Sequence, residues 1–149
     1  MRLVIRWVHV VAAVVWVGGV AYQAHVLMPA ARRSGAAAFA EAARRARPIT
    51  WTAIGLVVLS GFYNVTQLAP IERVMHSGAG ALLAAKFTLV ILAVALASQR
   101  DFAQVTLLNA AVASHADPTP VLRAIARLDR VVLVLALVVI YLGLAVSRA

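Results

Sequence analysis

Four long apolar segments constrain the fold of this chain more than any other feature of its sequence. They cover residues 3–28, 49–68, 79–98 and 131–146. Each approaches or exceeds the roughly 20 residues that an α-helix needs to cross the hydrocarbon core of a bilayer. Hydrophobic residues make up 64% of the 149-residue chain, a length that suits one domain. The sequence therefore predicts an all-α integral membrane protein, a single antiparallel four-helix bundle over residues 1–149.

Two segments that lie between the apolar ones are also expected to be helical. Residues 36–47 are rich in alanine, which has the highest helix propensity. The third apolar segment is expected to continue as a helix over 99–116, until the run Asp117-Pro-Thr-Pro120 breaks it. We interpret both segments as cytoplasmic extensions of the spans.

The distribution of arginine predicts the orientation of the chain in the membrane. The termini and the second loop carry four arginines: Arg2, Arg6, Arg73 and Arg148. The first and third loops carry nine: Arg32, Arg33, Arg44, Arg45, Arg47, Arg100, Arg123, Arg127 and Arg130. Because cytoplasmic loops are enriched in positive charge, both termini are expected outside the cell (inner) membrane. The net charge of +9 then reflects topology and contact with anionic lipid, so no nucleic-acid partner is expected.

Lys86 is the only lysine in the chain, and it lies about two turns inside the third apolar segment. Unlike arginine, a lysine amine can lose its proton and act as a base or a ligand. An ionisable group inside a membrane span is by default a candidate functional site. The alternative interpretation is that the Lys86 side chain extends to the headgroups and has no further role.

A histidine lies on one stripe of the first apolar segment, together with residues that suit a flat ligand. At about 100° per residue, His9, Ala13, Trp16 and Gln23 share this stripe, and Gly19 lies at its margin. Imidazole is a common protein ligand of haem iron, and glycine permits close approach of a macrocycle. The same small and aromatic residues also occur in ordinary helix packing and at membrane interfaces.

His9 and Lys86 are expected at similar depth, in the outer half of the membrane. The second and fourth segments bring Tyr63, Asn64 and Tyr141 towards the same leaflet. All five acidic residues are expected outside the apolar cores: Glu41, Glu72, Asp101, Asp117 and Asp129. A cation at Lys86 or His9 would then lack an acidic partner, so it would lose its proton or bind a counter-ion.

The first and third segments resemble one family of small membrane proteins. The resemblance rests on the run Trp7-Val-His9-Val-Val-Ala-Ala-Val-Val-Trp16-Val-Gly18-Gly19, on Tyr22 and Pro29, and on Ala85-Lys86-Phe87. These motifs are similar to those of the CopD and HemJ group. The resemblance to HemJ-type protoporphyrinogen oxidases implies a four-helix protein that binds haem b and depends on His9 and Lys86.

The leading hypothesis from the sequence is therefore a membrane protein that binds haem b. His9 would be an axial ligand of the iron, and Lys86 would be the second ligand or a catalytic group that manages a propionate or a substrate proton. Trp16, Gly19, Tyr63, Asn64 and Tyr141 would line the pocket. The protein would pass electrons or oxidise a lipophilic substrate such as a porphyrinogen or a quinol, because the cofactor supplies the redox chemistry.

Two alternatives remain open at this point. CopD-like proteins match equally well and imply copper binding or transport without redox catalysis, with Met75 and His76 of the second loop as candidate ligands. Cu(I) prefers sulfur ligands, and the chain has no cysteine. The chain could instead be a structural subunit in which the small residues serve helix packing. Small four-helix units often pair, so a homodimer with a site completed by a second copy is also considered.

Overall fold

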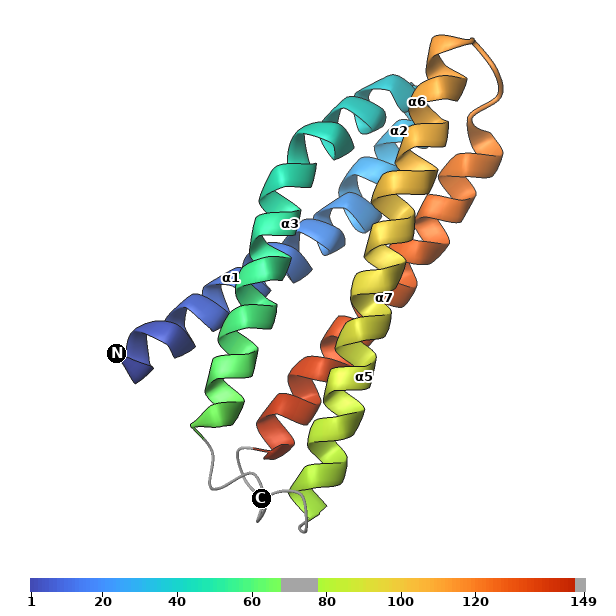
Figure 1. Ribbon diagram of the computed structural model, residues 1–149. Helices are drawn as coiled ribbons and strands as arrows, with labels where there is room; N and C mark the ends of the chain where they lie inside the picture. The colour runs from blue at the N-terminus through green and yellow to red at the C-terminus, as the bar shows by residue number, and fades with distance from the viewer. Residues whose placement is uncertain (68–77, 147–149) are drawn as a thin grey trace.

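The computed structural model describes residues 1–67 and 78–146, which fold into long helices without any strand (Figure 1). Four of the helical stretches are long and apolar enough to cross a membrane. The predicted fold class, an all-α four-helix membrane bundle, is therefore confirmed. The helical elements, in chain order, are α1 (Arg2–Tyr22), the π-helical η1 (Gln23–Leu27), α2 (Met28–Ser34), α3 (Ala36–Thr66), α5 (Gly78–Ser98), the π-helical η2 (Gln99–Gln104), α6 (Val105–Ala113) and α7 (Thr119–Val146).

The helices extend beyond the apolar segments from which they were predicted. Residues 36–47 form the first part of α3, which continues without a break into the apolar residues that follow. The turn from α2 to α3 is made by Gly35 alone, at φ 103°, a conformation that favours glycine. Residues 99–113 are helical, whereas the expected extension reached residue 116. The helix ends at Ala113 because His115 adopts φ 56°, which an α-helix does not allow.

The last helix begins well before the apolar segment that predicted it. Asp117 Oδ1 accepts a hydrogen bond from the Thr119 backbone N–H at 3.0 Å, next to two prolines that suit a helix start. As a result, α7 begins 12 residues before the apolar segment 131–146, and this first part of the helix includes Asp129.

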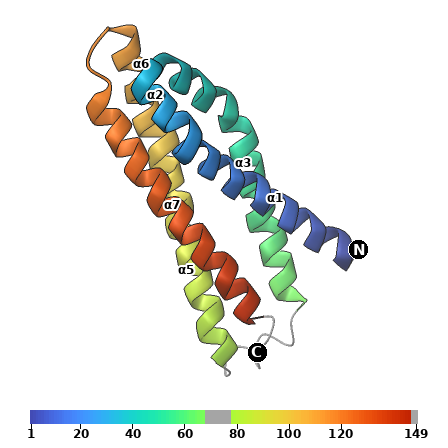
Figure 2. The ribbon, with the colours of Figure 1, turned by 180° about the vertical axis from the view of Figure 1, so that it is seen from behind.

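The bundle consists of two closely packed helix pairs. Helix α1 packs along α3, and α5 packs along α7, as the two opposite views show (Figures 1 and 2). Helix α1 also contacts α7. The rings of Phe62 on α3 and Phe87 on α5 lie 5.4 Å apart between centroids, which adds a contact between the pairs.

Two clusters of buried side chains form the core. The first lies where α2, α3, α6 and the start of α7 meet, and its most deeply buried members are Phe39, Val105, Leu108 and Ile125. The second lies further along the bundle and comprises Trp16, Val20, Ala53, Ile54, Ala93, Ala97 and Val132. Alanine is frequent in both clusters, which lets the helix backbones approach closely.

The two π-helical segments lie where the structure brings polar side chains inward. A π segment inserts one extra residue into a helix, and such segments occur often at functional sites. Gln23 is the first residue of η1, and Arg100 and Asp101 belong to η2. These three side chains are buried, and Arg100 Nη2 donates a hydrogen bond to Gln23 Oε1. The two segments therefore face each other across the bundle.

Candidate functional site

His9 lies half-buried on α1, against the last turns of α3. Its Nδ1 is 2.9 Å from Ser60 Oγ. The Ser60 hydroxyl also donates to the Leu56 carbonyl and lies 3.3 Å from the Val57 carbonyl. A hydroxyl has only one proton, and when a backbone carbonyl accepts it, Ser60 Oγ can accept a hydrogen bond from His9 Nδ1–H. This contact leaves the lone pair of the neutral imidazole on Nε2, the atom that can bind a metal ion.

Glycines on the partner helices give His9 and Lys86 the space they occupy. A Cβ atom at Gly61 would lie 3.3 Å from His9 Cε1. A Cβ atom at Gly143 would lie 3.1 Å from Lys86 Nζ. Each basic side chain therefore lies against the backbone of the other helix in its pair. His9 of α1 lies against α3, and Lys86 of α5 lies against α7. Lys86 is half-buried and within electrostatic reach of His9.

The hydrogen bond between Ser60 and His9 gives a direct prediction. Ser60→Ala is expected to remove the acceptor for Nδ1–H, so that the imidazole no longer has one dominant tautomer. Nitrogen-15 NMR of histidine-labelled protein in detergent distinguishes the two tautomers. Ser60→Thr, which keeps a hydroxyl, is expected to retain the Nδ1–H form. An Nε2–H form in the wild type, or an unchanged spectrum in Ser60→Ala, would contradict this assignment.

The other residues predicted to line a pocket lie at several places in the bundle. Trp16 is buried, and its ring lines a separate small cavity together with Gln23. Gly19 has open space where a side chain would begin. Tyr63 and Asn64 lie half-buried near the end of α3. Tyr141 is 70% exposed on α7.

The structure adds a feature to the expectation for the acidic residues. Asp101 and Asp129 lie outside the four apolar segments, as expected, but both are buried, at 3% exposure each, beside Arg100 at 7%. Arg100 Nε donates to Asp129 Oδ1 at 2.9 Å, and Arg100 Nη1 donates to Asp101 Oδ1 at 2.5 Å. Arg100 Nη2 completes the set with its bond to Gln23. The planar guanidinium therefore binds three partners at once, a geometry that lysine lacks.

Helix α3 adds two further residues to this network. Trp51 Nε1 donates to Asp101 Oδ2 at 3.0 Å, and Arg47 Nη2 donates to the Asp101 backbone carbonyl at 2.6 Å. The side chain of Phe102 covers both, with its ring centroid 5.3 Å from that of Trp51 and 5.1 Å from Arg47 Cζ. We call Gln23, Arg47, Trp51, Arg100, Asp101 and Asp129 the Arg100 cluster. Its members come from all four long helical stretches.

Sequence reasoning missed the Arg100 cluster because the spans were ended at the edges of the apolar segments. A signal for it was present. Arg100 and Asp101 follow the end of the third segment by two and three residues, and Asp129 precedes the start of the fourth by two. Antiparallel neighbours bring such positions to the same level, where opposite charges can pair.

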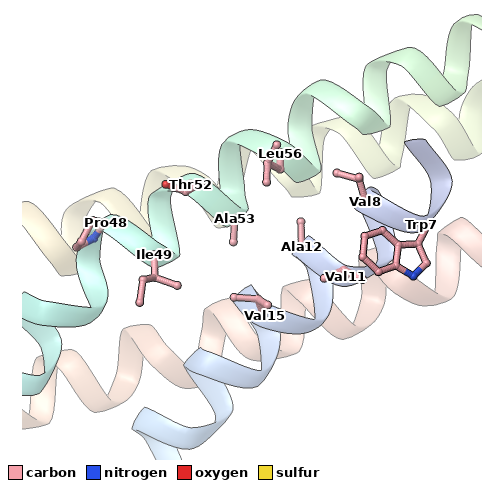
Figure 3. A pocket seen from close by; sticks show the side chains of 10 residues that line it. All are labelled: Trp7, Val8, Val11, Ala12, Val15, Pro48, Ile49, Thr52, Ala53 and Leu56. Carbon is pink, nitrogen blue, oxygen red and sulfur yellow. The ribbon is translucent and has the colours of Figure 1, made fainter. Parts of the chain in front are cut away.

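An open groove lies between α1 and α3 (Figure 3). Its volume is about 460 Å³, and nearly all of its lining is apolar. The residues around it are Trp7, Val8, Val11, Ala12, Val15, Pro48, Ile49, Thr52, Ala53 and Leu56. His9 and Lys86 are not among them, so the groove suits a lipid chain better than a charged ligand.

The described residues contain no group of three or more histidine, cysteine, aspartate or glutamate side chains that could hold a metal ion. Met28, a candidate sulfur donor, is only 3% exposed and belongs to the first core cluster. Met75 and His76, the predicted copper ligands of the second loop, lie outside the described residues. Of the predicted metal ligands, His9 and Lys86 lie within those residues.

A comparison with protein families identifies the chain. No curated protein and no solved structure matches it. The family model of copper resistance protein D, CopD, matches residues 40–146, which is more than half of the sequence. The match includes Ser60, Lys86 and the aspartates of the Arg100 cluster, whereas His9 precedes it. The chain is thus a multi-pass membrane protein that belongs to the CopD family.

Proposed function

We propose that this protein handles copper in the membrane, either binding it or passing it on, with His9 as one ligand. The observation that carries the proposal is the family match over residues 40–146. The contact with Ser60 supports the choice of His9, because it leaves Nε2 free to bind an ion. Imidazole is a suitable ligand for copper, and a hydrogen bond on the other ring nitrogen is the usual arrangement at metal sites.

The described donors make an incomplete copper site. One imidazole and one amine fall short of the three or four ligands that a tightly bound ion needs, and no cysteine is available. We propose that Met75 and His76, or a second copy of the chain in a homodimer, supply the rest. Such a site suits copper as an exchangeable cargo.

Copper titration of the purified protein in mild detergent tests this function. Wild-type protein is expected to bind copper in competition with a chromophoric chelator. His9→Ala should weaken binding by more than the roughly 10–100-fold that follows loss of an outer-shell partner. The matched control is His25→Ala, because His25 is exposed on η1 and bonds only within its own helix, to the Ala21 carbonyl.

The result distinguishes between the candidate ligands. Weaker binding in Met75→Ala and His76→Ala supports the second loop, and a ratio of one copper per two chains supports the homodimer. Wild-type protein that binds no copper, or His9→Ala protein that binds it as tightly as the wild type, would refute the proposal.

Haem b is the second candidate ligand of the same atom. A neutral imidazole with its lone pair on Nε2 also suits haem iron. Lys86 lies within electrostatic reach of the His9 side chain. Lys86 would then act as a second ligand, or as the group that transfers a proton to or from a porphyrinogen or quinol substrate. A Soret band after haemin titration that is absent in His9→Ala would favour haem over copper. Lys86→Arg separates a ligand from a side chain that only extends to the headgroups, since only the ligand role needs a neutral amine.

We further propose that the His9 and Lys86 end of the bundle faces outward. The opposite end carries exposed arginines on three elements, Arg32 and Arg33 on α2, Arg44 and Arg45 on α3, and Arg123 and Arg127 on α7. An excess of positive charge is typical of the cytoplasmic side, which would leave both termini outside the cell membrane.

A further inference from the structure

A small, partly open cavity lies beside the Arg100 cluster. Its volume is about 20 Å³, which is enough for one water molecule. Trp16 of α1, Thr50 of α3, Arg100 of η2 and Asp129 of α7 contribute to its wall. The cavity is thus reached by side chains from every long helical stretch.

Two residues that line this cavity each have a buried polar atom without a protein partner in the part of the chain that the structure describes. These atoms are Trp16 Nε1, a donor, and Asp129 Oδ2, an acceptor when the carboxyl is ionised. The two residues are 6% and 3% exposed. Buried polar groups are nearly always hydrogen-bonded, and a water molecule can accept from the indole while it donates to the carboxylate. The cavity therefore suits water and not a cation, which the indole N–H and Arg100 would repel.

The two aspartates of the cluster differ in how their oxygens are satisfied. Asp101 has a donor on each oxygen, Arg100 on Oδ1 and Trp51 on Oδ2. Asp129 has a donor only on Oδ1, from Arg100 Nε. Both oxygens of Asp101 are therefore occupied by donors. Asp129 Oδ2 is the one carboxylate oxygen of the pair that is free to carry a proton.

The charge balance also favours a proton on Asp129. With both carboxylates ionised, the three buried groups Arg100, Asp101 and Asp129 carry one excess negative charge. The next cation, Arg47, is half-buried and bonds to the backbone carbonyl of Asp101. An uncompensated buried charge is unfavourable, so protonation of one carboxyl relieves it.

We propose that Asp129 Oδ2 is a proton-binding site inside the bundle, served by one water molecule in the cavity. The cavity water donates one proton to Oδ2 while it takes up another from the bulk solvent, so its own O–H bonds are restored and no electrons are transferred. The groups that face Asp129 are Arg100 and Asp101 of η2, Trp16 and Gln23 of the first helical stretch, and Thr50 of α3. Arg47 and Trp51 act on it through Asp101. The site does not depend on the proposed binding of copper.

Infrared difference spectroscopy of the whole protein in lipid tests this site. Between high and low pH, within the range where the fold is intact, wild-type protein should gain a carboxylic-acid C=O band that shifts in D₂O. The band should be absent in Asp129→Asn and unchanged in Asp117→Asn, which alters an exposed loop aspartate. A band that persists in Asp129→Asn, or no such band in the wild type, overturns the proposal.

Two further variants keep the test decisive if Asp129→Asn does not fold. Asp129→Glu retains an acid, so its band should move in frequency and remain sensitive to pH. Trp16→Phe removes the donor on the other side of the cavity, so the band of Asp129 should shift while its amplitude is retained. Spectra of both variants identical to the wild type would show that the titrating acid is elsewhere.

Discussion

Arg100→Met is expected to lower the free energy of unfolding by about 3–5 kcal/mol. The substitution leaves Asp101 and Asp129, each 3% exposed, without their shared cation. It also removes the Arg100 Nη2 group that donates to Gln23 Oε1. Breaking a buried ion pair from one side costs more than the pair contributed, because a charge stays behind in a medium of low dielectric constant. Denaturation in detergent followed by circular dichroism measures the loss.

Two matched variants separate this effect from a general loss of positive charge. Arg127→Met removes an exposed arginine from α7 and is expected to change stability by less than about 0.5 kcal/mol. The triple variant Arg100→Met, Asp101→Leu, Asp129→Leu should regain most of the lost stability, since no buried charge remains. If Arg100→Met protein and wild-type protein unfold at the same denaturant concentration, the Arg100 cluster does not stabilise the packing of the helices.

Phe39→Ala is expected to be almost as damaging, with a loss of about 3–5 kcal/mol. Phe39 is 2% exposed in the first core cluster, and its ring lies 5.9 Å from Arg100 Cζ. Truncation removes buried apolar surface, leaves a cavity among α3, α6 and α7, and ends the contact between the ring and the guanidinium.

The comparison for Phe39 is Phe62→Ala. Phe62 is 61% exposed on α3 and has its ring contact with Phe87, so its loss should cost about 1 kcal/mol. The same denaturation measurement applies to both variants. Equal losses for Phe39→Ala and Phe62→Ala would mean that burial in this cluster does not stabilise the bundle.

The fold could be predicted from the sequence because its main determinant is local. Each apolar segment is long enough to specify a membrane helix by itself, whatever its neighbours are. The ends of the helices could not be predicted in this way. Helix α7 begins at Thr119, in a polar stretch, because Asp117 binds the Thr119 N–H and because the following turns pack on α6 and η2.

The candidate site was only partly accessible from the sequence. His9 and Lys86 are conspicuous as basic residues in apolar segments, but the partners that define their chemistry are not. Ser60, Gly61 and Gly143 are ordinary residues of membrane helices, and their contacts with His9 and Lys86 appear only when the helices are packed. Trp16 and Gln23 were assigned to the stripe of His9 from helical periodicity. Tertiary packing places Gln23 in the Arg100 cluster and Trp16 on the wall of the cavity beside it.

The division into two helix pairs has a mechanical consequence. The Arg100 cluster ties both pairs together at one level, whereas His9 belongs to one pair and Lys86 to the other. Lys86 is 14 residues from Arg100 along its helix, or about 21 Å. A rotation of one pair by about 5° around the cluster would therefore displace the amine relative to the imidazole by about 2 Å. The two helix pairs would pivot at the Arg100 cluster. A small change in the angle between the pairs would therefore produce a larger change in the distance between the two basic nitrogens.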